Sequence, residues 1–174
     1  MTIVSARLRG RRPERDDIDY RFEIDSDPDV QRTLFGKLST RNQSESRLQK
    51  WIDDWQEFGI GFWLFAGIDD GIVAGHAGLF PSRQIPGRVE LGYTVKPKFW
   101  GMGYATEMAR AVIAVAFNEL GLESVVANAM PENVASRRVL ERVGFSFVRD
   151  SLYDATFTNV EYQIKRRDVR RAAS

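Results

Sequence analysis

Residues 89–117, VELGYTVKPKFWGMGYATEMARAVIAVAF, constrain the fold of this chain more than any other stretch. Apolar and polar side chains alternate in the first seven residues, which is the period of a β-strand. Pro97 ends the strand because its ring removes a donor from the hydrogen-bond ladder. Gly101 and Gly103 follow, and then a helix in which apolar residues such as Met108 and Val112 recur every four positions. The pattern predicts a strand, a glycine-rich turn and a long helix.

The glycine-rich turn at the start of this helix is suited to a phosphate group. The first four amides of a helix lack intrahelical acceptors, and the helix dipole adds positive charge there. Glycines let a ligand approach the main chain, and Thr106 adds a hydroxyl one turn into the helix. The turn therefore favours a phosphate or pyrophosphate, although a simple strand-to-helix connection would also use these glycines. The lysine of a P-loop and the third glycine of a dinucleotide fingerprint are both missing.

The composition indicates one soluble globular domain that spans residues 1–174. A net charge of +1 gives no overall field that would attract nucleic acid or anionic lipid. The absence of cysteine excludes disulfides and thiolate chemistry, and the single histidine, His76, argues against a histidine metal site or a Ser-His-Asp triad. His76 lies in an apolar run and is expected to be a hydrogen-bonded core residue. Without a signal pattern or a long apolar span, we expect a cytoplasmic protein that needs no metal.

Hydrophobic periodicity and turn residues predict the remaining elements. We expect strands at 3–8, 62–68, 71–80, 124–130, 145–149 and 159–164, and helices at 13–23, 44–58 and from Asn133 to Gly144. The Asp-rich segment from Asp25 to Pro28 is expected to be a turn. The strands at 62–68 and 71–80 should form a hairpin and continue as an antiparallel meander into 89–95. The strand at 124–130 follows a strand-helix crossover, so it should lie parallel to 89–95.

Two features of the chain are open to more than one interpretation. Leu48, Trp51 and Trp55 form an apolar stripe at helical spacing, which favours a place in the core but would also suit a lid over a substrate. Arginines near the N-terminus and in the C-terminal tail, KRRDVRRAAS, would suit a nucleic-acid patch. The N-terminal arginines alternate with acidic residues, which favours a solvated, self-compensated surface.

The strand, the WGMGYAT turn, the long helix, the next strand and the segment PENVASRRVLERVGF together resemble the GCN5-related N-acetyltransferase (GNAT) superfamily. The resemblance is narrower to the branch that includes the ribosomal-protein N-terminal acetyltransferases. It covers nearly the whole chain and depends on two motifs about thirty residues apart. It implies an α/β (α+β) fold with a mixed central sheet of about seven strands. In that fold an N-terminal meander is antiparallel, two central strands are parallel and splayed, and helices cover both faces.

The resemblance implies acetyl-CoA as the co-substrate, with its pyrophosphate on the main-chain amides of residues 101–106. The signature Gln/Arg-x-x-Gly-x-Gly/Ala is occupied here by Trp100, Gly101, Met102, Gly103, Tyr104 and Ala105, with Thr106 next. Trp100 replaces Gln or Arg, and Met102 stands where a basic residue is common. Tyr93 and Val95 would bond the pantetheine arm through their main chain. Asn133 matches an asparagine that touches this arm, and it also suits a plain helix cap.

Candidate catalytic residues follow from the chemistry of acetyl transfer and from the resemblance. Glu90 is the candidate general base, although a glutamate on a central strand is equally often a satisfied polar residue. Relatives place a tyrosine at the position of Leu140 to protonate the leaving thiolate, and that tyrosine is absent here. Ser136 matches a serine of the ribosomal branch and is expected to donate a hydrogen bond to the sulfur.

The leading hypothesis is an N-acetyltransferase that moves the acetyl group of acetyl-CoA to a primary amine in a ternary complex. A protein N-terminal α-amine is favoured because its lower pKa leaves more of it neutral than of a lysine. The alternatives are a small-molecule amine such as an aminoglycoside, polyamine or amino acid, or a non-catalytic acyl-CoA-binding regulatory module. A nucleic-acid binder is a further alternative. We expect a monomer or homodimer without a nucleic-acid or membrane partner.

Overall fold

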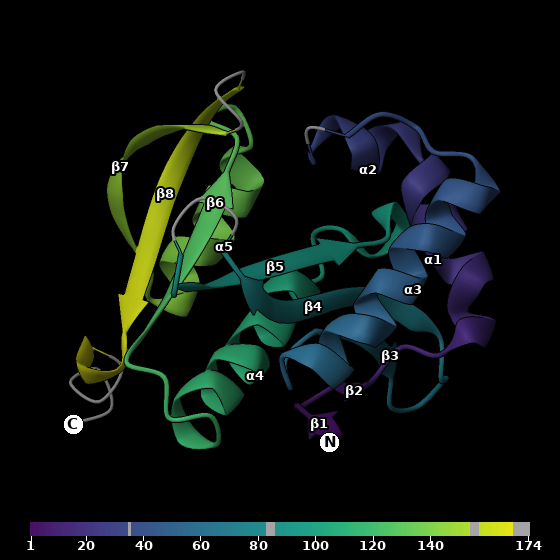
Figure 1. Cartoon of the computed structure of the whole chain (residues 1–174), viewed down its shortest axis with the longest axis horizontal. Helices are drawn as coiled ribbons and strands as arrows, with labels where there is room; N and C mark the ends of the chain where they lie inside the picture. Colours follow the sequence, from purple (N-terminus) through teal and green to yellow (C-terminus); the bar gives the residue numbers. More distant parts are fainter. Residues whose placement is uncertain (35, 83–85, 154–156, 169–174) are drawn as a thin grey trace.

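A mixed sheet in the order β1-β2-β3-β4-β5-β6-β8-β7 runs through the whole computed structural model, with helices on both of its faces (Figure 1). The structure describes residues 1–34, 36–82, 86–153 and 157–168. The described strands are β1 (Ile3–Val4), β2 (Leu8–Arg11), β3 (Phe62–Gly67), β4 (Val73–Pro81), β5 (Val89–Val95), β6 (Ser124–Ala129), β7 (Ser146–Tyr153) and β8 (Phe157–Lys165). The predicted mixed α/β fold is therefore confirmed.

The two central strands, β5 and β6, are parallel, as the crossover between them predicts. Their register contains only the pairs Glu90↔Val126 and Leu91↔Ala127, whereas β5 continues to Val95. Figure 1 shows the two strands diverging, with β5 nearly horizontal and β6 steep. The other strand pairs of the described sheet are antiparallel. We call the opening between β5 and β6 beyond Leu91 and Ala127 the wedge.

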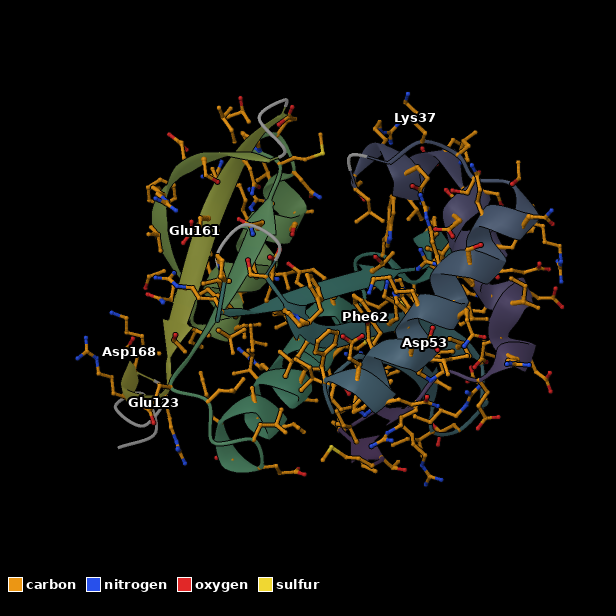
Figure 2. All side chains as sticks on the ribbon, viewed as in Figure 1. Lys37, Asp53, Phe62, Glu123, Glu161 and Asp168 are labelled. Carbon is orange, nitrogen blue, oxygen red and sulfur yellow. The ribbon has the colours of Figure 1, made fainter. Side chains whose placement is uncertain are left out.

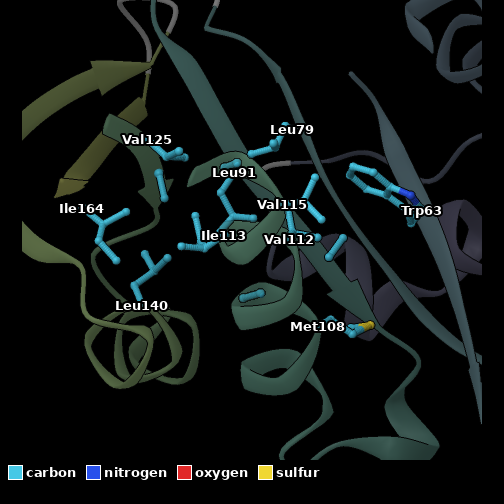
Figure 3. Close-up of a cluster of buried hydrophobic side chains, with 14 of the residues drawn as sticks. Trp63, Leu79, Leu91, Met108, Val112, Ile113, Val115, Val125, Leu140 and Ile164 are labelled. Carbon is cyan, nitrogen blue, oxygen red and sulfur yellow. The ribbon is translucent and has the colours of Figure 1, made fainter. Parts of the chain in front are cut away.

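Two groups of helices cover the sheet (Figure 1). They are α1 (Ile18–Ser26), α2 (Pro28–Arg32) and α3 (Arg41–Glu57) on one face, and α4 (Tyr104–Asn118) and α5 (Val134–Val143) on the other, with short 3-10 turns at Arg15–Asp17 and Pro97–Phe99. The four-residue repeat of α4 produces its buried stripe, which includes Met108 and Val112 (Figure 3). This stripe packs with Leu79 and Leu91 of the sheet in the main core.

A second, smaller core lies under α1 and α3. Leu48 and Trp51 of α3 are buried there, and the ring of Trp51 lies 4.5 Å from that of Phe62 on β3, so the core interpretation of the aromatic stripe is confirmed. His76 is also buried in this region, and its Nδ1 lies 2.7 Å from the hydroxyl of Tyr20. Burial, together with the nearby Arg21 charge, lowers the pKa of His76 well below its ordinary value. His76 is therefore a neutral core residue, as the sequence predicts.

The structure corrects several predicted N-terminal boundaries. The single strand expected at 3–8 is two short strands, β1 and β2, because the Ser5 hydroxyl and main chain bond to Leu8 and turn the chain. The helix expected at 13–23 begins as a 3-10 turn, and α1 itself runs from Ile18 to Ser26. The helix expected to begin at residue 44 starts three residues earlier, because Thr40 and Gln43 form a capping box.

One helix was missed, and the count of strands was low by one. The segment after Asp25 was expected to be a turn, but the Asp27 side chain accepts from two amides and Pro28 begins α2. The two C-terminal strands are longer than predicted, and the split at Ser5 raises the sheet to eight described strands. Asn133 and Gly144 bound α5 as predicted. The basic tail lies partly outside the described residues, and no described helix is both long and apolar enough to span a membrane.

The buried carboxylate of Asp25 joins α1 to α3 through hydrogen bonds and ion pairs. Its carboxylate is 1% exposed and accepts two hydrogen bonds from the Arg21 guanidinium, at 2.7 and 3.0 Å. Ser44 donates to it at 2.9 Å and Arg47 at 3.2 Å, both from α3. A buried cation left without its carboxylate is costly, so this contact should stabilise the layer of helices above the sheet.

We predict that Asp25→Asn lowers the free energy of unfolding by about 3 kcal/mol, because Arg21 would remain buried without its counter-charge. Asp29→Asn is the matched control, since Asp29 is half-exposed and, among the described residues, forms an ion pair only with exposed Arg32. Its effect should stay within about 0.5 kcal/mol. Chemical denaturation of the two variants and the parent measures both values, and equal stabilities for the two variants would contradict the prediction.

Candidate functional site

The N-terminus of α4 is an open cradle of main-chain amides. Gly101 and Gly103 have φ angles of 78° and 80°, in the left-handed region where a side chain is strained, so the turn requires glycine at both positions. The amides of Gly101 and of residues 103–106 have no acceptor among the described residues, whereas the Met102 amide bonds weakly to Phe99 O at 3.4 Å. The dipole of a fifteen-residue helix adds to these donors. This arrangement fits a pyrophosphate.

Arg7 holds the cradle from the turn between β1 and β2. Its guanidinium donates to Met102 O at 3.0 Å and to Glu107 Oε2 at 2.7 and 2.8 Å, and it lies 4.5 Å from the centre of the Tyr104 ring. The other oxygen of Glu107 accepts from the Arg7 amide and the Ser5 hydroxyl. Arg7 was not predicted, because its partners lie 95 and 100 residues away in the chain. Arg7, paired with Glu107, thus ties the turn between β1 and β2 to the cradle.

The main chain of β5 faces the wedge at two of the predicted positions. Lys96 N–H donates to Ala74 O at 2.9 Å, so the even-numbered residues of β5 direct their amides and carbonyls toward β4. The main-chain groups of Tyr93 and Val95 therefore point the other way, toward the wedge. Val95 O accepts from the indole Nε1 of Trp100 at 2.7 Å. Trp100, the first residue of the signature, thus links β5 to the cradle.

Glu90 lies at the closed end of the wedge and is buried. The Asn128 amide of β6 donates to Glu90 Oε1 at 2.9 Å, and the Asn159 amide of β8 donates to Asn128 Oδ1 at 2.7 Å. Next to this series of hydrogen bonds, Glu161 of β8 (labelled in Figure 2) forms ion pairs with Arg88 and Arg149. Sequence reasoning missed both asparagines. An alternating strand pattern gives the face of a residue but not its partner two strands away.

Two predicted residues of α5 lie close to β5 and α2. The Ser136 hydroxyl is 2.8 Å from the Tyr93 hydroxyl, so the Tyr93 side chain reaches from β5 to the first turn of α5. Asn133 Oδ1 accepts from the Ser136 amide at 3.0 Å, which confirms the helix cap, and Asn133 Nδ2 donates to Thr33 O at 3.3 Å. Leu140 is 1% exposed and belongs to the core.

The predicted site residues thus come from three elements that meet at the wedge: β5, the turn before α4, and the start of α5. Main-chain amides lie at one end, a buried carboxylate lies at the other, and paired hydroxyls lie between strand and helix. This geometry can receive an extended ligand with a diphosphate at one end. Among the described residues no group of three or more histidine, aspartate or glutamate side chains is placed to hold a metal ion.

Comparison with known proteins agrees with this geometry. Residues 7–146 match the family model of the acetyltransferase (GNAT) domain. This chain belongs to the GNAT acetyltransferase family. It is an acetyl-CoA-dependent N-acetyltransferase.

Two curated relatives cover most of this GNAT chain. One is FsC-acetyl coenzyme A-N(2)-transacetylase of Aspergillus fumigatus, which is 32% identical over 84% of this chain and 66% of its own length. The other is the protein YkkB of Bacillus subtilis, 31% identical over 83% of this chain and 85% of its own. This chain therefore spans about two thirds of the fungal enzyme.

Solved GNAT structures have the same fold. A GNAT acetyltransferase from Bacillus anthracis superposes with a TM-score of 0.83 at 25% identity, over 96% of this chain and 99% of that one. AAC(6′)-Ib in complex with paromomycin and acetyl-CoA has a TM-score of 0.82 at 16% identity, over 96% and 98% of the two chains. At that identity the second likeness concerns the fold alone.

We predict that Glu107→Gln lowers the free energy of unfolding by about 1 kcal/mol at pH 7. Burial opposes ionisation of Glu107, but the bonds from Arg7 and Ser5 outweigh it and lower its pKa below the ordinary value of 4.5. A depressed pKa stabilises the fold above the unfolded value and ceases to do so as the pH falls through the folded value. The difference between parent and variant should therefore be constant above about pH 5 and shrink below about pH 4.5.

Thermal unfolding from pH 3 to pH 8 measures this difference. The exposed Glu45, whose side chain makes a 3.9 Å contact with Arg41, provides the control Glu45→Gln. A pH-independent loss in Glu107→Gln would contradict the ionic role of this carboxylate.

Proposed function

We propose that residues 1–174 form one catalytic domain in which acetyl-CoA lies along the wedge. The amides of Gly101 and of residues 103–106 would bind the pyrophosphate, with Arg7 beside them. The main-chain groups of Tyr93 and Val95 would bond the pantetheine arm, and Asn133 would contact it near the start of α5. The single observation that carries this proposal concerns two sets of main-chain N–H groups, one on the cradle and one on β5. Neither set has acceptors among the described residues.

Glu90 is the proposed general base. Asn128 fixes one carboxylate oxygen of Glu90 by a 2.9 Å hydrogen bond, which orients the group on the strand face opposite to Tyr93. A neutral amine attacks the thioester carbonyl carbon, a main-chain amide near Tyr93–Val95 stabilises the oxyanion, and the carbon–sulfur bond breaks. The amine proton passes to Glu90, directly or through water, and the electron pair of the broken bond leaves on sulfur.

The favoured acceptor is the α-amine of a peptide N-terminus. An α-amine with a pKa of about 8 is roughly one-tenth neutral at pH 7, whereas a lysine at about 10.4 is neutral in fewer than about one molecule per thousand. A single buried carboxylate provides limited help with deprotonation, so the more acidic ammonium should react faster. A small-molecule amine is the second candidate, and the fungal relative, named as an N(2)-transacetylase, supports it.

We expect short peptides with a free N-terminus to be acetylated faster than the same peptides blocked at the N-terminus and carrying one lysine. A thiol-release assay at pH 7 over both peptide sets, aminoglycosides, polyamines and amino acids measures the preference. A matched pair of peptides that differ only in the position of the free amine is the control. Faster reaction of the lysine peptide would overturn the α-amine proposal, and a clear preference for one small molecule would favour the second candidate.

Glu90→Gln should lower kcat/KM by about 10² to 10³ at pH 7, as expected for loss of a general base. The decrease of kcat/KM at acidic pH that is expected for the parent should be absent in the variant. Binding should persist, measured as the rise in melting temperature with acetyl-CoA. Glu123→Gln is the control, because the Glu123 side chain is largely exposed and its one ion pair within the described part of the chain is a 3.9 Å contact with Arg166. Full activity in Glu90→Gln would show that this carboxylate is only a satisfied polar residue.

A further inference from the structure

Tyr93 and Ser136 make a polar connection between β5 and α5. The Tyr93 hydroxyl lies 2.8 Å from Ser136 Oγ and 3.0 Å from Ser136 O. Tyr93 lies beyond the last register pair of β5 with β6, and its side chain reaches Ser136 on the face of the sheet that carries α4 and α5. Ser136 is half-buried in the first turn of α5, at the positive end of that helix dipole. Both hydroxyls therefore lie beside the wedge, between β5 and the first turn of α5.

The Tyr93–Ser136 pair contains two hydroxyl hydrogens. Burial raises the pKa of Tyr93, so its hydroxyl keeps its hydrogen at neutral pH and can donate one bond. Both acceptors within reach are oxygens of Ser136. When Tyr93 donates to Ser136 Oγ, the serine hydrogen points elsewhere, and the described part of the chain offers it no other acceptor than the Tyr93 oxygen. The pair thus presents one hydroxyl hydrogen that a ligand can accept.

We propose that Tyr93 is a positioning residue that turns the Ser136 hydroxyl toward the leaving sulfur of the thioester. In the free protein Ser136 donates to the Tyr93 oxygen while Tyr93 donates to Ser136 O. With a thiolate in the wedge, Ser136 donates to sulfur and Tyr93 donates to Ser136 Oγ. The exchange needs only rotation of two hydroxyl groups. This inference rests on the proposed function, because it takes acetyl-CoA to lie in the wedge.

The step is hydrogen-bond stabilisation rather than proton transfer. When the carbon–sulfur bond breaks, its electron pair stays on sulfur, and the resulting thiolate is held by the Ser136 hydroxyl. Transfer of the serine hydrogen would require a buried tyrosinate or an alkoxide, and both are more basic than a thiolate whose acid has a pKa of about 8.5. The thiolate therefore leaves the site and takes its proton from water, while the amine proton leaves through Glu90.

The charge on bound coenzyme A is the decisive measurement. The thiol of coenzyme A should titrate at least about 1 unit below its free value of about 8.5 when it is bound to the parent protein, because Ser136 stabilises the thiolate. Ultraviolet absorption of the thiolate, against a baseline with desulfo-coenzyme A, follows this titration. Ser136→Ala should remove most of the shift, and Tyr93→Phe should remove part of it.

Kinetics provide the second measurement. Ser136→Ala should lower kcat by about 10- to 100-fold, as expected for loss of one hydrogen bond to a charged atom, with the KM for acetyl-CoA unchanged. Tyr93→Phe should lower kcat by a smaller factor, and the double variant should be no slower than Ser136→Ala alone, since Tyr93 acts through Ser136. Ser136→Thr keeps the hydroxyl and should restore most of the rate.

Tyr162→Phe is the matched control. Tyr162 is a buried tyrosine whose hydroxyl bonds to the same helix, at Arg137 and Glu141, both at 3.1 Å. This variant should leave both the thiol titration and kcat unchanged. If it changes them as much as Tyr93→Phe does, the effect comes from helix packing and the inference is overturned.

The outcomes separate this inference from the proposed function. Failure of coenzyme A to raise the melting temperature of the parent would overturn the proposed site itself. Binding with an unshifted thiol, or with the same shift in the parent and in Ser136→Ala, would overturn the inference and leave the proposed site intact. Melting temperatures of the variants without ligand identify any loss of folding, and Ser136→Thr then provides the comparison in a folded protein.

Discussion

The separation of β5 from β6 after two residue pairs is the constraint on which the rest of this structure depends. Continued parallel pairing would have used the main-chain groups of Tyr93 and Val95 in the sheet. Because the strands diverge, these groups need partners from elsewhere. Beneath the sheet, α4 packs against β4 and β5, and both α4 and α5 contact β6 (Figures 1 and 3).

The alternation of side chains along β5 divides the proposed chemistry between the two faces of the sheet. Glu90 points to the face that carries α3, where Asn128 and Asn159 hold it. Tyr93 points to the face that carries α4 and α5, where it meets Ser136. In the proposed reaction the amine proton is collected on one face, and the charge on sulfur is stabilised on the other. A strand with unpaired main-chain groups between the two faces would hold the reacting carbonyl.

Local sequence signals predicted the fold well where neighbouring residues alone specify an element or its connection to the next. The hairpin of β3 and β4, the parallel crossover to β6 and the bounds of α5 all follow from period, turn chemistry and caps. The predictions were wrong where one side chain sets a boundary. Asp27 caps a five-residue helix inside a segment expected to be a turn, and Ser5 turns the chain in the middle of an expected strand. Propensity averaged over a window does not register such single bonds.

The sequence by itself determined the elements and the glycine turn, because periodicity, left-handed glycines and helix caps are properties of neighbouring residues. It also placed Glu90, Tyr93 and Ser136 on their elements. Only the tertiary structure decided which of them meet. The contacts Arg7–Glu107, Tyr93–Ser136 and Glu90–Asn128 join residues 100, 43 and 38 positions apart. Such pairs depend on how strands and helices pack in three dimensions, and no local pattern specifies them.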